Sequence, residues 1–427
     1  MKTLIVNSGS SSIKYQLIDV TSFDVLQSGE AAQIGFPGSY IRSKSKTRMK
    51  HINVALPDHE AGIRMVLNGL LDPDIGVIKS LDEIGAVGHR IVHGGKYFDG
   101  PAIVDDDVLD KIKKLIKLAP LHNDAAAKGI EACMHQMQGI PQVVSFDTAF
   151  HMTIPPEHHT YALPYEYYTD YDVRKYGFHG ISHDYVSRRV AALMGRRRES
   201  MRIVSCHLGN GGSICAIKKG KSFDTSMGFT PLDGIMMGTR CGSIDPAIIP
   251  FIMEEKDLTP QEMDAILNRE SGLLGVSGIS NDIREIDEAR YSGNYRADLA
   301  LKMYAESVRR YIGAFAFEMG GCDALTITAG IGQNSAMMRR MILEHMEGFG
   351  IVCDWEANAN VGAKDCAIST EGSPIQVYVI HTNEEYIIAK DCERLCAKPE
   401  EIAFDNDPLK EPAKDFDTSK GIPFIEE

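Results

Sequence analysis

The feature that most constrains the fold of this chain is a strand–turn–strand pattern that occurs twice. Near the N-terminus, the aliphatic run Leu4–Val6 leads into the small-residue turn Asn7–Ser12 and then into a second run, Ile13–Ile18. The same order returns between residues 203 and 217, around the turn Gly209–Ser213. Because β-rich runs separated by Gly and Ser are hairpin signals, the sequence predicts a duplicated α/β domain with two facing polar loops.

Helical patterns alternate with further strands along the chain. Acidic residues at Asp105–Asp107 and the order of cap, proline and carboxylate at Thr259 predict two helix starts. An apolar pattern that starts at Ser182 and stops at Gly195 predicts a third helix. The runs 142–146 and 324–328 read as strands. This alternation favours mixed or parallel sheets covered by helices.

Two further helices are expected in the last third of the chain. Residues 296–318 predict a long helix, whose expected apolar face comprises Leu299, Met303, Val308, Ile312 and Phe315. The segment Thr382–Glu385 has the form of a capping box, which predicts a helix up to about Ala397. In that box Glu385 takes the capping role, which leaves Glu384 free for a metal or for solvent.

Size, charge and cysteine spacing limit the possible classes of protein. A chain of 427 residues predicts two or three domains, at about 150 residues each. A net charge of −14 argues against binding to nucleic acid or to an anionic membrane. No uncharged apolar run reaches the roughly 18 residues of a membrane span, the N-terminal run is too short for a signal peptide, and the nine cysteines include no CxxC pair. We therefore expect a cytoplasmic protein with reduced thiols.

The C-terminal residues 398–427 differ in composition from the rest. They contain four prolines, and nine acidic residues against four basic ones. We expect a solvated tail without a part in the chemistry.

Several familiar motifs can be set aside. Gly220-Lys221-Ser222 resembles the end of a P-loop, but Cys215 stands where the upstream glycine is required. The run 330–335 lacks the third glycine of a dinucleotide-binding loop. The pairs His89/His93 and His179/His183 have zinc-like spacing without the glutamate of HExxH, so hydrogen-bonding histidines are favoured over zinc ligands.

The remaining polar residues suggest anion binding. Backbone N–H groups in Gly/Ser turns form nests that approach phosphate oxygens, although tight hairpins alone would have the same sequence. Arg90 and Arg240 lie in glycine-flanked segments and could present their guanidinium groups to phosphate or carboxylate, or form surface ion pairs. Asp147 follows a strand, where α/β proteins usually hold their active sites.

At these residues the sequence resembles the acetate kinases, of the acetate and sugar kinase/Hsp70/actin superfamily. The matching segments, in the family's order from residue 7 to residue 385, are NSGSSSIK (7–14), GHRIVHGG (88–95), FDTAFH (146–151), YGFHGISH (176–183), HLGNGGS (207–213), DTSMGFTPLDGIMMGTR (224–240), TAGIGQN (328–334) and TNEE (382–385).

The resemblance implies the fold class and the domain boundaries. It implies two duplicated actin/ribonuclease H-like domains that flank an active-site cleft. The N-terminal domain would comprise residues 1–148 and 383–397, and residues 149–382 would form a C-terminal domain for nucleotide binding and dimerisation. It further implies a cytoplasmic homodimer.

The resemblance also implies an activity and its site. The activity is reversible, Mg²⁺-dependent phosphoryl transfer from ATP to acetate by direct in-line transfer, giving acetyl phosphate and ADP, with Mn²⁺ as a second possible metal. Arg90, Arg240, Asp147 and His179 would act in catalysis. Asn7 and Glu384 would position the metal. The nucleotide site would comprise Lys14, His207, Leu208, Gly209, Asn210, Gly211, Gly330, Ile331, Gly332, Gln333 and Asn334. The acyl pocket, beside Arg90, would comprise Val92, Leu121, Phe178 and Pro231.

This chemistry is consistent with the residue types. A carboxylate is already a nucleophile, so the reaction needs no strong base; it needs positive charge that offsets the repulsion between two anions. The alternatives are a kinase that prefers propionate or butyrate, a pyrophosphate-linked acetate kinase and, from another class, an actin/Hsp70-like ATPase. An ATPase of that kind would not need the paired arginines or the short acyl pocket.

Overall fold

The computed structural model describes residues 1–397 and 409, which form two compact units. The first unit contains Met1–Phe150 and the segment that begins at Asn383, and the second contains His151–Thr382. Apart from residue 409, the expected acidic tail lies outside the described residues.

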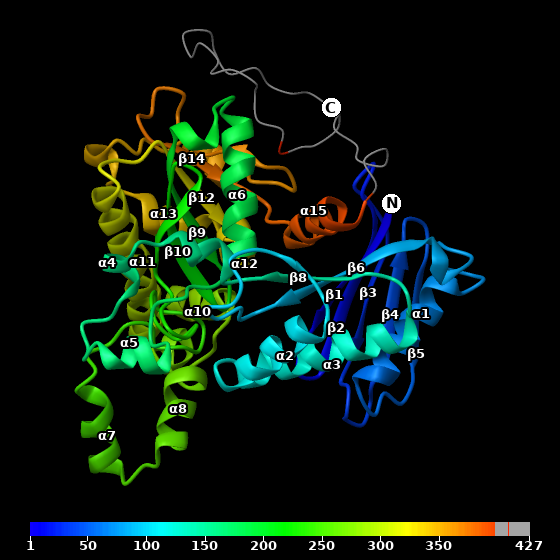
Figure 1. Ribbon diagram of the computed structural model, residues 1–427. Coiled ribbons are helices and arrows are strands. Elements are labelled where there is room, and N and C mark those ends of the chain that lie inside the picture. The colour runs from blue at the N-terminus through cyan, green and yellow to red at the C-terminus, as the bar shows by residue number, and fades with distance from the viewer. Residues whose placement is uncertain (398–408, 410–427) are drawn as a thin grey trace. The chain divides into compact units, whose positions relative to one another are not determined.

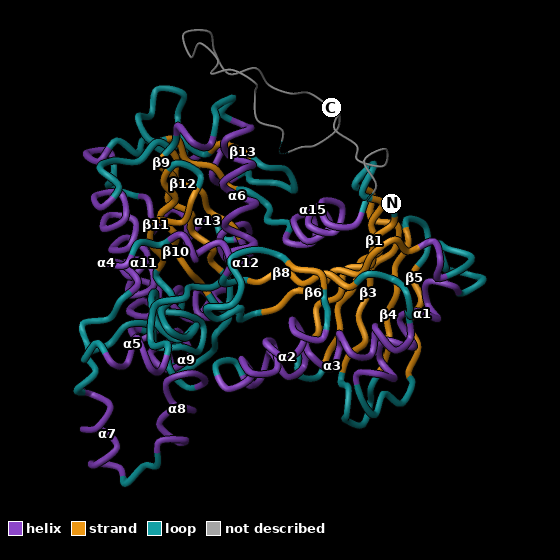
Figure 2. The backbone as a smooth tube through the Cα atoms, viewed as in Figure 1, coloured by secondary structure: helices purple, strands orange, loops and turns teal. Residues whose placement is uncertain are grey.

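An eight-stranded sheet forms the centre of the first unit, with the strand order β5-β4-β3-β2-β1-β6-β8-β7 (Figure 2). Its strands are β1 (Lys2–Ser8), β2 (Ser12–Asp19), β3 (Asp24–Ala32), β4 (Tyr40–Ser45), β5 (Met49–Asn53), β6 (Ile84–Ile91), β7 (Ala102–Ile103) and β8 (Gln142–Phe146). Strands β1 to β5 pair antiparallel in succession, whereas β1, β6 and β8 run parallel.

Helices cover both faces of this sheet (Figure 1). They are α1 (His59–Leu71), α2 (Asp106–Lys114), α3 (Pro120–Gln136) and α15 (Glu384–Cys396). The apolar residues of α1 share one core cluster with Leu4 and Val6 of β1, and Cys392 of α15 lies in another cluster with Ala86 and Val143 on the opposite face. Alternate residues of the central strands therefore serve two separate cores.

A six-stranded sheet forms the centre of the second unit, with the order β11-β10-β9-β12-β14-β13. Its strands are β9 (Arg202–Leu208), β10 (Gly212–Lys218), β11 (Lys221–Thr225), β12 (Ala324–Thr328), β13 (Cys366–Ala367) and β14 (Gln376–Val379). Its helices are α4 (Pro156–His159), α5 (Glu166–Tyr171), α6 (Gly180–Leu193), α7 (Ile248–Lys256), α8 (Pro260–Arg269), α9 (Gly272–Ser277), α10 (Ile283–Tyr291), α11 (Tyr295–Glu318), α12 (Ala329–Asn334), α13 (Ala336–Leu343) and α14 (Trp355–Ala359). Helices α6 and α11 pack against this sheet.

The two sheets share one topology. In each, an antiparallel hairpin continues into a third antiparallel strand on one side (β1-β2-β3 and β9-β10-β11), and two parallel strands follow on the other side (β6-β8 and β12-β14). The predicted mixed α/β duplication is therefore confirmed.

Local signals place several helices correctly. Asp105 caps α2 through Val108 N, and Thr259 and Glu262 form the predicted capping box of α8. The expected apolar face of α11 is partly wrong, because Val308 and Phe315 are buried whereas Met303 is exposed. The described helices include none that is both long and apolar enough to cross a membrane, and all nine cysteines are free thiols.

Candidate active site

Arg90 is the centre of the polar site in the first unit. It lies near the end of β6, beside the parallel strand β8, after which the chain continues into Asp147. Arg90 Nε donates to Asp147 Oδ1 over 3.0 Å, and Nη2 donates to Oδ2 over 2.7 Å. A second carboxylate reaches the same guanidinium, since Glu384 Oε2 lies 3.1 Å from Arg90 Nε. One cation is therefore held between two carboxylates.

Burial and charge oppose each other in this cluster. Asp147 is only 2% exposed, and burial raises its pKa to about 6, even though Arg90 acts to lower it. For Arg90, burial acts to lower the pKa, but the charges of Asp147 and Glu384 outweigh it and raise the pKa above its ordinary value. Arg90 therefore stays charged, and Asp147 is a carboxyl group that can hold a proton in mildly acidic solution.

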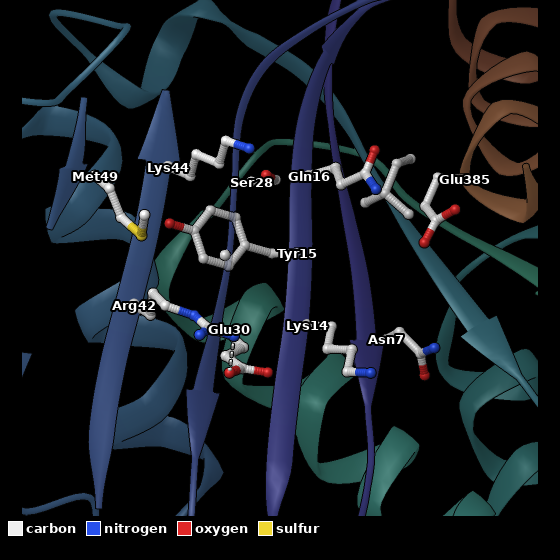
Figure 3. A pocket seen from close by; sticks show the side chains of 12 residues that line it. Asn7, Lys14, Tyr15, Gln16, Ser28, Glu30, Arg42, Lys44, Met49 and Glu385 are labelled. Carbon is white, nitrogen blue, oxygen red and sulfur yellow. Dashed lines mark hydrogen bonds and ion pairs between the residues drawn. The ribbon is translucent and has the colours of Figure 1, made fainter. Parts of the chain in front are cut away.

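A hollow of about 340 Å³ opens on the sheet of the first unit, and it brings together Asn7, Lys14 and Glu385 (Figure 3). Asn7 and Lys14 are register partners on β1 and β2. Burial, together with repulsion from Glu384, raises the pKa of Glu385, while Arg90 and Lys14 oppose that rise. Asn7 and Glu384 supply amide and carboxylate oxygens, the type of donor that Mg²⁺ prefers.

The predicted phosphate loop of the second unit is the turn between β9 and β10. Gly209 N donates to Gly211 O over 3.1 Å, and Gly238 N donates to Asn210 O over 2.9 Å. A Cβ atom at Gly238 would lie 2.0 Å from Asn210 Oδ1, so any larger residue at this position would displace the Asn210 side chain. Asn281 Nδ2 donates to Asn210 Oδ1 over 2.8 Å. Nothing in the sequence pattern connected Asn281 with this loop.

The second predicted nucleotide segment lies against the first. A Cβ atom at Gly209 would lie 3.8 Å from the Cβ of Ala329, and one at Gly332 would lie 3.7 Å from the Cβ of Leu208. Asn334 Nδ2 donates to Gly330 O over 2.8 Å. Gln333 Nε2 donates to Ile380 O over 3.4 Å, while Ile331 is half-buried.

Arg240 differs from Arg90 in its partners. Its Nη1 donates weakly to Pro231 O over 3.4 Å, and a Cβ atom at Gly211 would lie 3.2 Å from that nitrogen. Burial lowers its pKa. Within residues 1–397 and 409, the structure gives Arg240 no carboxylate partner, so this partly buried guanidinium suits an incoming anion.

Two of the predicted site histidines stack on each other. The rings of His179 and His207 lie 4.2 Å apart at an interplanar angle of 12°. His179 Nδ1 bonds Ser213 Oγ over 2.8 Å, and His207 Nδ1 bonds Ser182 Oγ over 2.9 Å. Ser182 also bonds Thr382 Oγ1 over 2.7 Å.

The predicted acyl-pocket residues divide between the units. Val92 and Leu121 belong to the first unit, and Phe178 and Pro231 belong to the second. Val92 and Pro231 are half-buried, and Phe178 is buried. Leu121 lies at the start of α3, but its side chain is outside the described part of the structure.

Two helix starts differ from the sequence-based predictions. Helix α6 begins at Gly180, because His179 takes a left-handed conformation before it, and Ser182 bonds His207 instead of capping. Helix α15 is capped by Asn383, which accepts from Tyr386 N. The expected capping box at Thr382–Glu385 is therefore wrong, and Glu384 is an ion-pair partner of Arg90 and not a free carboxylate.

The histidine pairs with zinc-like spacing are engaged in hydrogen bonds, as expected. His89 Nε2 bonds Gln142 Oε1 over 2.8 Å, and His93 Nδ1 accepts from Gly95 N over 3.0 Å.

A different set of possible metal ligands, His158, Asp224 and Glu318, lies together in the second unit. Lys175 Nζ already lies 2.5 Å from Asp224 Oδ1, and His158 Nδ1 lies 3.2 Å from Oδ2. Asp224 of this group is therefore already paired with Lys175 and His158.

Comparisons with known proteins agree over nearly the whole chain. The model of the acetokinase family matches residues 2–390. An acetate kinase of Methanosarcina acetivorans is 50% identical over 397 residues, which are 93% of this chain and 97% of that protein. An acetate kinase of Caldanaerobacter subterraneus subsp. tengcongensis is 52% identical over 92% of this chain and 99% of its own length.

Solved structures give the same result. The crystal structure of Porphyromonas gingivalis acetate kinase is 43% identical, with a TM-score of 0.89, over 92% of this chain and 99% of that one. A propionate kinase from Francisella tularensis is 38% identical, with a TM-score of 0.85, over 91% and 98% of the two chains. The chain described here belongs to the acetokinase family.

Proposed function

We propose that this chain catalyses the reversible, Mg²⁺-dependent transfer of a phosphoryl group from ATP to acetate, giving acetyl phosphate and ADP. The observation that carries this proposal is the identity of 50% and 52% to acetate kinases over more than nine-tenths of the chain. The geometry supports it, because each unit contains a partly buried guanidinium group and the second unit adds Gly-rich turns, while a carboxylate acceptor needs no strong base.

The two arginines have different parts in this proposal. Asp147 holds Arg90 by two hydrogen bonds and so positions it to bind the acetate carboxylate. Arg240, without a carboxylate partner among the described residues, binds the transferring phosphoryl group. Donors fixed before the reaction stabilise developing charge without reorganisation, which is the main requirement of in-line transfer between two anions.

The nucleotide and the metal are assigned to the remaining polar groups. We place the phosphates of ATP on the turn Gly209–Gly211 and on Lys14, and the rest of the nucleotide on Gly330–Asn334. His179 donates a hydrogen bond to the transferring phosphoryl group, and His207 lies beside the phosphate loop. Asn7 and Glu384 would hold Mg²⁺, which supplies positive charge to the phosphates.

The two units correspond, in this proposal, to the two domains of a duplicated fold, and residues from both act on one pair of substrates. The acyl group would contact Val92, Leu121, Phe178 and Pro231. Propionate is a second candidate substrate, because a propionate kinase is 38% identical to this chain.

We further propose a cytoplasmic homodimer formed through the second unit. Tyr295, Met303 and Phe317 of α11 are 74%, 42% and 88% exposed. At 3.6 residues per turn they fall within an arc of about 80° on one helix face. An exposed apolar stripe of this kind is typical of an interaction surface.

The test of the function is an acyl phosphate trap. Purified protein is incubated with ATP, Mg²⁺, hydroxylamine and acetate, propionate, butyrate or no acid. More hydroxamate with acetate than with the other acids supports the proposal. Preference for a longer acid would instead indicate a kinase that prefers propionate or butyrate. ADP release without hydroxamate would indicate an ATPase, and activity with pyrophosphate in place of ATP would overturn the nucleotide assignment.

A further inference from the structure

Four side chains of the second unit form a continuous hydrogen-bonded chain that ends at His179. Ser205 Oγ bonds His183 Nδ1 over 2.9 Å, and His183 Nε2 bonds Ser213 Oγ over 2.8 Å. Ser213 Oγ then bonds His179 Nδ1 over 2.8 Å. Ser205, His183 and Ser213 are all 0% exposed, so bulk solvent does not reach these hydrogen bonds.

Burial fixes the charge state of the central histidine. Removal from water, followed by the charges that His151 and His207 can carry, lowers the pKa of His183 well below its ordinary value. His183 is therefore neutral and has one N–H, so one ring nitrogen donates and the other accepts.

The buried hydroxyl of Ser205 decides which nitrogen of His183 accepts. In the part of the chain that the structure describes, His183 Nδ1 is the one partner of Ser205 Oγ. If Nδ1 carried the proton and donated it, the Ser205 hydroxyl proton would be buried without an acceptor, which is unfavourable. Ser205 therefore donates to Nδ1, and His183 carries its proton on Nε2.

The same logic continues along the chain. His183 Nε2–H donates to Ser213 Oγ, so the single proton of Ser213 is directed to His179 Nδ1. His179 must then carry its proton on Nε2. Each donor points in the same direction, from Ser205 towards His179.

One backbone feature and one ring contact further restrict His179. Its backbone is in the left-handed region, with φ 57° and ψ 23°, a conformation that is strained for a residue with a side chain. The ring is stacked on His207. A strained backbone and a stacked ring at a site residue indicate an orientation fixed by its surroundings.

We propose that Ser205, His183 and Ser213 are positioning residues, which keep His179 in the tautomer protonated on Nε2 so that it donates a hydrogen bond to the transferring phosphoryl group. The proposal rests on the proposed function for the identity of the acceptor. The tautomer itself is independent of that function.

The direct test is the tautomer of His179 in the full-length protein labelled with ¹⁵N-histidine. Nitrogen NMR at mildly alkaline pH, with His179→Gln to assign the resonances, should show a protonated Nε2 and an unprotonated, hydrogen-bonded Nδ1. A proton on Nδ1 would overturn the proposal. This measurement needs no variant of the positioning residues and no activity.

The second test is kinetic. In Ser213→Ala, the Nδ1 resonance should move to that of a nitrogen without a hydrogen bond, and kcat should fall about tenfold with the KM for acetate within about twofold. Ser213→Thr, which keeps the hydroxyl, should restore most of kcat. An unchanged kcat in Ser213→Ala, or an equal loss in Ser213→Thr, would contradict the positioning role.

Ser222→Ala is the matched control. Ser222 lies on β11, the strand paired with β10, and its buried hydroxyl bonds His151 Nδ1 over 2.8 Å. The variant loses a similar Ser–His hydrogen bond that is not part of the series from Ser205 to His179, so the His179 tautomer and kcat should stay unchanged. Equal effects in Ser213→Ala and Ser222→Ala would overturn the proposal. If the wild-type protein forms no acetyl hydroxamate, the proposed function fails, and the NMR result decides the tautomer alone.

Discussion

Removal of the Arg90 side chain should destabilise the protein in a way that depends on pH. In Arg90→Ala, Asp147 and Glu384 lose the cation between them, and Asp147 stays buried at 2% exposure. Breaking a buried ion pair by removal of one partner typically costs about 3–5 kcal/mol. We therefore expect the free energy of unfolding at pH 8 to fall by about that amount.

The sign of the pH dependence follows from the pKa of Asp147. In the wild type this pKa is raised from 3.8 to about 6, so the folded state binds more protons than the unfolded state between those values. The contribution of this carboxyl to the free energy of unfolding is complete at low pH and falls by about 3 kcal/mol as the pH rises from 4 to 6. Above pH 6 it changes little further.

Without Arg90 the folded-state pKa of Asp147 must rise further, because the nearby positive charge is gone. The free energy of unfolding then continues to fall above pH 6, by up to about 1.4 kcal/mol per pH unit. Urea denaturation followed by circular dichroism at pH 6, 7 and 8 measures this slope. The double variant Arg90→Ala/Asp147→Asn should remove the slope and recover most of the stability.

Arg42→Ala is the control in the same unit. The Arg42–Glu30 pair is exposed, with 53% and 20% of the side chains accessible, and such pairs contribute about 0–1 kcal/mol. Arg42→Ala should show neither the large loss of unfolding free energy nor its dependence on pH. If Arg90→Ala matches Arg42→Ala at every pH, or if the double variant keeps the slope, the inferred arrangement of charges is wrong.

The remaining predictions concern activity. Arg240→Ala should lower turnover at least about 100-fold with unchanged urea unfolding, as measured by the hydroxamate assay, and near-normal turnover would remove Arg240 from the mechanism. Gly238→Ala should weaken ADP binding in calorimetry at least about tenfold, because its Cβ would lie 2.0 Å from Asn210 Oδ1, whereas Gly362→Ala, with nothing within 4 Å, should not. Val92→Ala should raise the propionate-to-acetate ratio of kcat/KM at least about fivefold, and an unchanged ratio would exclude Val92 as the limit of the pocket. EDTA should abolish turnover and added Mg²⁺ should restore it; activity that persists in EDTA would contradict the metal assignment.

Local chemistry made the sheets predictable. The hairpins around Asn7–Ser12 and Gly209–Ser213 were visible because aliphatic strands and small turn residues differ so strongly in backbone preference. The caps at Asp105 and Thr259 were visible because their side-chain oxygens accept from free backbone N–H groups in the first turn of each helix. These features depend on neighbours in sequence, which a single chain displays directly.

Tertiary contacts account for most of what was missed. The pairing of Glu384 with Arg90 joins residues almost 300 positions apart. Thr382 has the sequence position of a cap, but its hydroxyl is hydrogen-bonded to the Ser182 hydroxyl. The helix face of α11 was misjudged because the small residues Ala297, Ala300 and Ala305 are buried there, and periodicity of large side chains does not reveal them.

In the proposed site, the ion pairs of Arg90 also affect how tightly the acid binds. The guanidinium is already paired with two carboxylates, so an acid that binds there as proposed must displace the ion pair with Glu384. Binding is then an exchange between similar anions, and its free energy is a small difference between two similar quantities. In the proposed site the acid is therefore bound weakly, and either acid or acyl phosphate is released rapidly, which suits a reaction that runs in both directions.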